Sequence, residues 1–79
     1  MPIAVECSFD ADGWVRVRRV RLDDRWHMVE QGRQWADEQG KHVLVLLPAG
    51  VAGGVRELLL RADTLTWEMR ELPGGRQVM

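Results

Sequence analysis

The feature that most constrains the fold of this chain is a short apolar run, residues 42–47, near its middle. Five consecutive Val and Leu residues follow His42 without a charge, and Gly40 and Pro48 bound the run. A run this short, closed by turn-forming residues, is typical of a β-strand that is buried on both faces. The rest of the chain must therefore fold around this strand and keep water off both of its sides.

The length and composition of the chain limit what can surround that strand. Its 79 residues, of which 46% are hydrophobic, predict one small globular domain over residues 1–79. A chain of this size buries roughly 60% of its unfolded surface. Residues 73–79 begin with Pro-Gly-Gly, which predicts a flexible tail.

Targeting and membrane signals are not found in the sequence. No apolar run approaches the roughly 18 residues that a membrane helix needs. The N-terminus lacks the basic and apolar regions of a signal peptide. Cys7 is the single cysteine, so it has no partner for an intramolecular disulfide. We therefore expect a cytoplasmic protein that makes no contact with membranes.

The N-terminal part of the chain predicts a hairpin of two strands. Apolar and polar residues alternate over 3–9, and the Asp-Gly pair at 12–13 is a hairpin-turn signal. In the second strand, residues 14–22, the apolar positions change parity at the arginine pair 18–19. A strand changes parity only where one residue is added, so we predict a β-bulge there, followed by a tight turn at 23–24.

Two later segments, residues 25–39 and 55–71, allow a helix as well as strands. On a helical wheel the apolar residues of the first segment fall on opposite sides, and Gly32 lies in its middle. We therefore prefer one strand over 26–35, kinked at Gly32. In the second segment, apolar and polar residues alternate strictly over 65–70, which favours a hairpin of two strands.

These elements predict an all-β fold, a small curled antiparallel sheet or SH3-like barrel of five to six strands. The alternative is an α+β fold with one helix, at residues 25–39 or at residues 55–71. Because a short open sheet leaves unpaired edge strands, we also expect self-association as a homodimer. The expected core contains large apolar side chains: Trp26, Leu44, Leu46, Trp67 and Met69.

A pattern of tryptophans, an apolar strand and acidic residues extends over about half of the chain. It consists of residues 26–29 (WHMV), Trp35, residues 42–47, Glu57-Leu58, Asp63 and residues 66–69 (TWEM). This pattern resembles a family of short bacterial all-β domains of unknown function, some of which are appended to DNA polymerase-like proteins of the lesion-bypass type. The resemblance implies a curled sheet of five or six strands and implies no activity.

The side chains most suited to nucleophilic catalysis or to a zinc site are few: Cys7, His27 and His42. A nucleophilic Cys–His pair also needs an orienting group, and a zinc site needs three or four ligands, commonly in close pairs. No spacing in the sequence provides either arrangement. We therefore predict no catalytic residues, no metal and no cofactor, and we expect a protein that is not an enzyme.

The clearest candidate for a binding face is the Arg-rich second strand. Between Trp14 and Arg33 the chain has six arginines and three acidic residues. The bulge at 18–19 would make the arginines of this strand project from one face beside a tryptophan. Trp35, near a hairpin tip, is a second candidate exposed aromatic. The candidate binding face consists of Trp14, Arg16, Arg18, Arg19 and Arg21.

This face has a structural explanation and two functional ones. Long positive side chains on a solvated face protect a sheet from edge pairing. An exposed tryptophan beside arginines is also typical of protein-contact sites and of surfaces that bind single-stranded nucleic acid. The sequence favours an interaction or accessory module that binds a protein partner or a second copy of itself. The alternative is weak, sequence-tolerant binding of nucleic acid, which the net charge of −1 disfavours.

Overall fold

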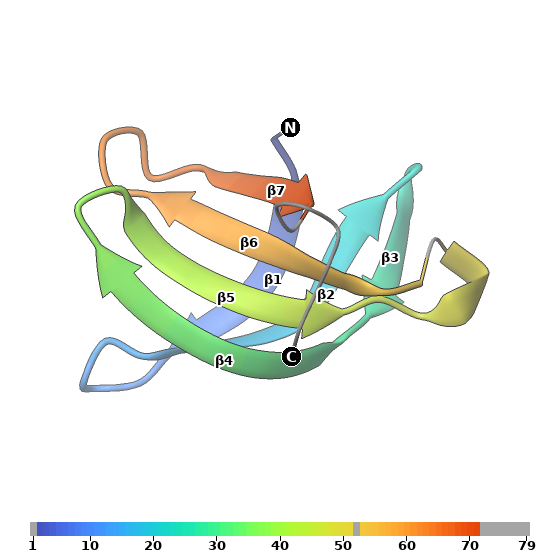
Figure 1. Cartoon of the computed structure of the whole chain (residues 1–79), viewed down its shortest axis with the longest axis horizontal. Helices are drawn as coiled ribbons and strands as arrows, with labels where there is room; N and C mark the ends of the chain where they lie inside the picture. Colours follow the sequence, from blue (N-terminus) through green and yellow to red (C-terminus); the bar gives the residue numbers. More distant parts are fainter. Residues whose placement is uncertain (1, 52, 72–79) are drawn as a thin grey trace.

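The computed structural model of the protein describes residues 2–51 and 53–71, which are mostly β-strand (Figure 1). This part of the chain contains no α-helix, so the predicted all-β class is confirmed, and the alternatives with a helix at 25–39 or 55–71 are wrong. The predicted tail, residues 73–79, lies outside the described residues. The elements are β1 (Ala4–Phe9), β2 (Val15–Leu22), β3 (Arg25–Met28), β4 (Glu30–Asp37), β5 (Gly40–Leu46), the 3-10 turn η1 (Ala49–Val51), β6 (Val55–Arg61) and β7 (Trp67–Glu71).

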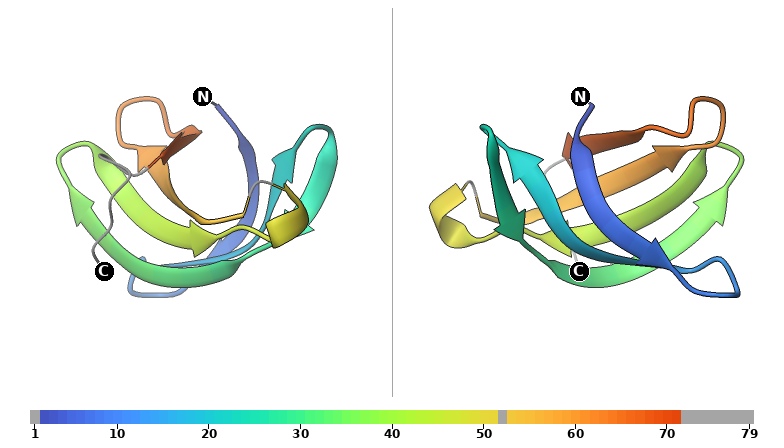
Figure 2. Two further views of the ribbon diagram at one scale, coloured as in Figure 1. Left: turned by 45° about the vertical axis from the view of Figure 1, so that its right-hand side comes forward. Right: turned by 180° about the vertical axis from the view of Figure 1, so that it is seen from behind.

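The strands form two antiparallel sheets that curl around a shared interior (Figure 2). One sheet has the order β1-β2-β3, and the other has the order β4-β5-β6-β7. The small curled all-β architecture is thus confirmed, but the described residues contain seven strands instead of the predicted five to six, and the two sheets do not close into an SH3-like barrel. They meet where the backbone N–H of Ile3 donates to the carbonyl oxygen of Trp67 at 3.1 Å. Within the described ranges, no helix has the length and hydrophobicity needed to span a membrane.

Strand β2 contains the β-bulge that the sequence predicts. On one side of the bulge β1 pairs with Arg19 and on the other side with Val17, so Arg18 has no partner on β1. The extra residue turns the later apolar side chains of β2 back toward the interior. Val17 and Val20 are therefore both buried, although they differ in parity.

The single kinked strand predicted over residues 26–35 is wrong, because the chain changes sheets at Val29. Strand β3 ends before this residue and pairs with β2, whereas β4 begins after it and pairs with β5. The backbone N–H of Val29 donates to the carbonyl oxygen of Arg18 at 3.2 Å, which holds the crossing point against β2. The kink itself is confirmed, since β4 has one residue more than β5 in the stretch that contains Gly32.

The core lies between the two sheets and is built from the inward positions of β2, β5 and β6. Its members share almost complete burial: Val15, Val17, Val20, Val43, Val45, Leu47 and Leu58. Trp67 and Met69 are half-buried and pack against this cluster, as partly expected.

The prediction that Leu44 and Leu46 belong to the core is wrong. Leu46 is 45% exposed and Leu44 is only half-buried. Successive residues of a strand point to opposite faces, and the inward positions of β5 are Val43 and Val45. Among residues 42–47, the outer face of β5 is well covered only at His42, so the apolar run is not buried on both faces along its whole length.

Two glutamines of β4 join the sheets where backbone pairing between them is missing. The side-chain amide of Gln34 accepts from the N–H of Val15 at 3.0 Å and donates to the carbonyl oxygen of Val15 at 2.9 Å. The amide of Gln31 accepts from the N–H of Val17 at 2.7 Å and donates to the same Val15 oxygen at 3.0 Å. These amides replace the missing strand partner and satisfy backbone groups at a part-buried seam.

Gln31→Leu is expected to lower the free energy of unfolding by about 1–3 kcal/mol, because the N–H of Val17 loses its acceptor. Hydrogen exchange of the Val17 amide should become faster at the same time. Gln39→Leu is the matched control, since Gln39 is exposed in the turn between β4 and β5. Chemical denaturation and amide exchange measure both effects. Equal stability of the two variants would contradict the conclusion that Gln31 joins the two sheets through the backbone of β2.

Candidate functional site

An open groove of about 1040 Å³ lies over the outer face of β1 and β2, the face turned away from the core, and extends along the seam with β4. We call it the β1–β2 groove. Four of the five residues of the predicted binding face line it: Trp14, Arg16, Arg18 and Arg19. The groove also includes Glu6 and Met28 among its lining residues.

Local sequence patterning and the bulge explain why these arginines gather. The valines of β2 point inward and are buried, so the residues between them point outward. The extra residue Arg18 lies next to Arg19, and both line the groove. Arg21 follows on the same strand but does not line the groove, and its Nη2 lies 3.9 Å from Asp24 Oδ1.

The three groove arginines differ in their partners. Arg16 and Arg18 are exposed, and neither has an ion pair among residues 2–51 and 53–71. Arg19 Nε instead donates to Glu6 Oε1 at 2.6 Å. This hydrogen bond lowers the pKa of the Glu6 carboxyl and raises the pKa of Arg19. Two guanidinium groups of the groove are therefore free to bind an anion, and one is held by a carboxylate.

Aromatic side chains lie at both ends of this arginine row. Trp14, 47% exposed, has Lys41 Nζ 5.8 Å from the centroid of its ring. Trp26, which the sequence assigned to the core, is 40% exposed, and that prediction is wrong. Trp26 lies on the edge strand β3 and pairs with Arg21 of β2. The guanidinium of Arg19 lies over its ring, 5.3 Å from the centroid.

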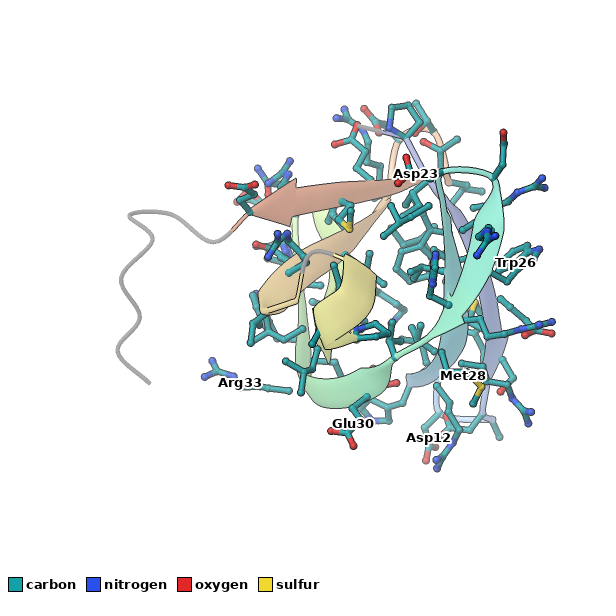
Figure 3. The ribbon with its side chains drawn as sticks, turned by 90° about the vertical axis from the view of Figure 1, so that its right-hand side faces the viewer. Asp12, Asp23, Trp26, Met28, Glu30 and Arg33 are labelled. Carbon is teal, nitrogen blue, oxygen red and sulfur yellow. The ribbon has the colours of Figure 1, made fainter. Side chains whose placement is uncertain are left out.

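Met28, which lines the groove, and Trp26, which lies beside it without lining it, are outward-facing residues that sequence reasoning missed. Both project from the outer side of β3, where Met28 is 69% exposed (Figure 3). Their alternation along β3 was visible in the sequence, but it does not say which of the two faces of an edge strand is covered. Once the partners of β3 are known, the pairing of these residues with Arg21 and Arg19 places them on the outer face.

Trp35, the second candidate exposed aromatic, is not part of the groove. It is half-buried and stacks flat on the His42 ring, with centroids 4.9 Å apart and an interplanar angle of 1°. The guanidinium of Arg33 covers it at 5.2 Å from the ring centroid. Trp35 therefore serves as a cover for His42 and is not available as a free stacking surface.

The His42 ring is a second titratable site, on the outer face of the four-stranded sheet. It is 4% exposed, its Nδ1 is hydrogen-bonded to Glu57 Oε2, and its Nε2 is 2.8 Å from Asp37 Oδ1. Burial lowers the pKa of His42, but the bonds to Glu57 and Asp37 outweigh it and raise the pKa above the usual value. The same contact lowers the pKa of Asp37.

The nucleophile and metal ligands considered in the sequence do not converge in the structure. Cys7 is half-buried and packs against the core, and burial raises the pKa of its thiol. His42 lies on the other sheet with both ring nitrogens bound to carboxylates. In the part of the chain that the structure describes, no three His, Cys, Asp or Glu side chains are placed to share a metal ion.

Comparisons of the chain with models of protein families, with curated proteins and with solved structures found no match. What the β1–β2 groove can bind follows from its own residues. It has free guanidinium groups for an anion and an exposed indole for a planar group.

Proposed function

We propose that this protein is a non-enzymatic interaction module that binds single-stranded nucleic acid weakly and without sequence preference in the β1–β2 groove. The observation that carries the proposal is the placement of two guanidinium groups, Arg16 and Arg18, which have no ion pair within the described residues, in the same groove as the exposed ring of Trp14. Guanidinium groups bind phosphate oxygens in a fixed planar geometry. A tryptophan stacks on any base, because every base has a π-face.

The geometry of the groove favours a single strand over a duplex. An indole at the surface stacks only on a base that is free of its own neighbours, and duplex bases are already stacked. Binding is expected to be weak, because only two free cations lie in the groove and the carboxylates of Glu6 and Asp10 also line it. Self-association through the open sheet edges stays a prediction.

A labelled oligothymidine titrated at low salt tests the proposal by fluorescence anisotropy. The wild-type protein is expected to bind with a Kd of roughly 1–100 μM, and log K should fall with log salt by about 0.7 per phosphate contacted. Arg16→Glu/Arg18→Glu should weaken binding by at least about tenfold, because it replaces two attractive charges by two repulsive ones.

Arg25→Glu/Arg33→Glu is the matched control for this test. Both arginines are exposed and lie outside the groove lining, so the double variant changes the net charge equally. It should retain most of the binding. The proposal would be contradicted by a wild-type protein that does not bind at 100 μM, or by equal losses in the two double variants.

A further inference from the structure

Glu6 and Arg19 form an ion pair inside the proposed binding groove. They are direct cross-strand partners on β1 and β2, and Arg19 Nε lies 2.6 Å from Glu6 Oε1. Their side chains are 45% and 42% exposed, respectively, so a ligand in the groove can reach both. An exposed pair of this kind is weak and is screened by salt. A phosphate can therefore compete with the Glu6 carboxylate for Arg19.

The same contact also keeps an aromatic surface occupied. While Arg19 is bound to Glu6, its guanidinium lies over the Trp26 ring at 5.3 Å from the centroid. That face of Trp26 is then covered by a cation and is not free to stack on a base. The free protein thus presents Arg16, Arg18 and one face of Trp14, whose other face has Lys41 Nζ 5.8 Å from the ring centroid, while Arg19 and one face of Trp26 are engaged.

The other carboxylate in the groove lining has a different task. Asp10 Oδ1 accepts from the backbone N–H of Asp12 at 2.9 Å and from that of Trp14 at 3.0 Å, and so stabilises the turn between β1 and β2. Glu6 makes no such bond to the backbone in the described residues: its hydrogen bond is to Arg19, and the nearby charge of Arg18 also helps to lower the pKa of its carboxyl. Of the two carboxylates, Glu6 is therefore the one placed to control a ligand-binding side chain.

We propose that Glu6 is an internal competitor of the phosphate group: it holds Arg19 and keeps it from a phosphate of the bound strand. The proposal rests on the proposed function and adds its regulation. Release of Arg19 adds a third phosphate contact to the two that Arg16 and Arg18 provide. It also uncovers the Trp26 ring for a second base. Glu6 thereby sets both the affinity of the groove and the number of counterions released on binding.

Glu6→Gln tests this proposal directly with the same labelled oligothymidine. We expect an affinity about tenfold higher at low salt and a salt dependence steeper by about 0.7, the slope for one added phosphate contact on a single strand. Glu30→Gln is the matched control, because this substitution removes the same charge. Glu30 is exposed at the start of β4 and lies outside the groove lining (Figure 3). The control should leave the slope unchanged.

A second pair of variants separates competition for Arg19 from a general charge effect. In an Arg19→Gln background, Glu6→Gln should raise the affinity much less than it does in the wild type and should leave the salt slope unchanged, because only its charge near Arg18 in the groove is then removed. Glu6→Asp keeps the negative charge but shortens the side chain, so it should loosen the contact with Arg19 and raise the affinity by about two- to threefold. Circular dichroism checks that each variant is folded, and the outward position of Glu6 makes folding of all of them the expected result.

The outcomes distinguish this proposal from the function on which it rests. Binding by wild type with equal affinities and slopes for Glu6→Gln and Glu30→Gln would overturn the role of Glu6 and leave nucleic-acid binding intact. Absence of binding by the wild type and by Glu6→Gln at 100 μM would overturn both proposals.

Discussion

Leu58→Ala is expected to lower the free energy of unfolding by about 3 kcal/mol, a large part of the stability of a chain this small. Leu58 has no exposed surface, and it lies on β6 between its cross-strand partners Val43 and Met69. The neighbouring strands hold these partners in place, so they cannot close the space left by the lost side chain. Urea denaturation followed by circular dichroism measures the effect.

Leu46→Ala is the control for Leu58→Ala, because it makes the same chemical change on the outer face of β5. Leu46 is 45% exposed, so we expect a loss of about 1 kcal/mol or less. The sequence alone would have ranked Leu46 among the most costly positions. A loss at Leu46 as large as the loss at Leu58 would show that the inward and outward faces of β5 have been exchanged.

His42→Ala is expected to destabilise the protein by about 3 kcal/mol. The substitution leaves the carboxylate of Glu57, whose side chain is 12% exposed, without its partner. Removing one member of a buried charged pair costs more than the pair contributes, because the remaining charge stays out of water. It also removes the ring on which Trp35 stacks. Urea denaturation at pH 6 measures the loss. A His42→Ala variant as stable as the wild type would show that the contacts of His42 with Glu57 and Trp35 do not stabilise the fold.

The same site makes the stability of the protein depend on pH. The folded-state pKa of His42 is raised above the ordinary value of 6.5, so its charge contributes fully below about pH 6.5. That contribution is lost as the pH rises through the raised pKa. Asp37 has a lowered pKa, so its contribution is present above the ordinary value of 3.8 and is lost as the pH falls through the lowered one.

Denaturation midpoints between pH 6 and pH 9 test this pH dependence. The wild type is expected to lose stability over this range, whereas His42→Gln, which can bond to one carboxylate but carries no titrating charge, should lose less. The difference between the two proteins is the measured quantity, because it cancels titrations elsewhere in the chain. Parallel pH profiles would contradict a raised folded-state pKa of His42.

Much of the fold could be predicted from local patterns. The parity change at 18–19 predicts the bulge, Gly32 predicts the kink in β4, and the aspartates at 23–24 predict a tight turn. The turn follows because two-residue turns of type I′ need positive φ at both positions, and Asp adopts such angles more readily than most residues. Asp23 and Asp24 have φ angles of 53° and 65°. Each of these features depends on a few consecutive residues and on the period of a strand.

The placement of the groove arginines was also accessible from the sequence. Once the bulge is located, the alternation of β2 assigns its valines to the interior and its arginines to the outer face. The sequence did not show which of these arginines form an ion pair and which do not. The bond between Glu6 and Arg19 depends on the register of β1 and β2, which is a property of the paired strands.

The rest was decided by tertiary structure, because alternation along a strand does not say which of its faces is covered. Leu46 and Trp26 are exposed since no strand of residues 2–51 and 53–71 packs over their side of the sheet, and His42 is buried since Trp35, Glu57 and Asp37 come to it from neighbouring positions of the fold. The alternation of apolar and polar residues along the sequence determines where the strands and the bulge lie. The order of the strands, which depends on contacts between distant segments, set the core and the partners of each charged side chain.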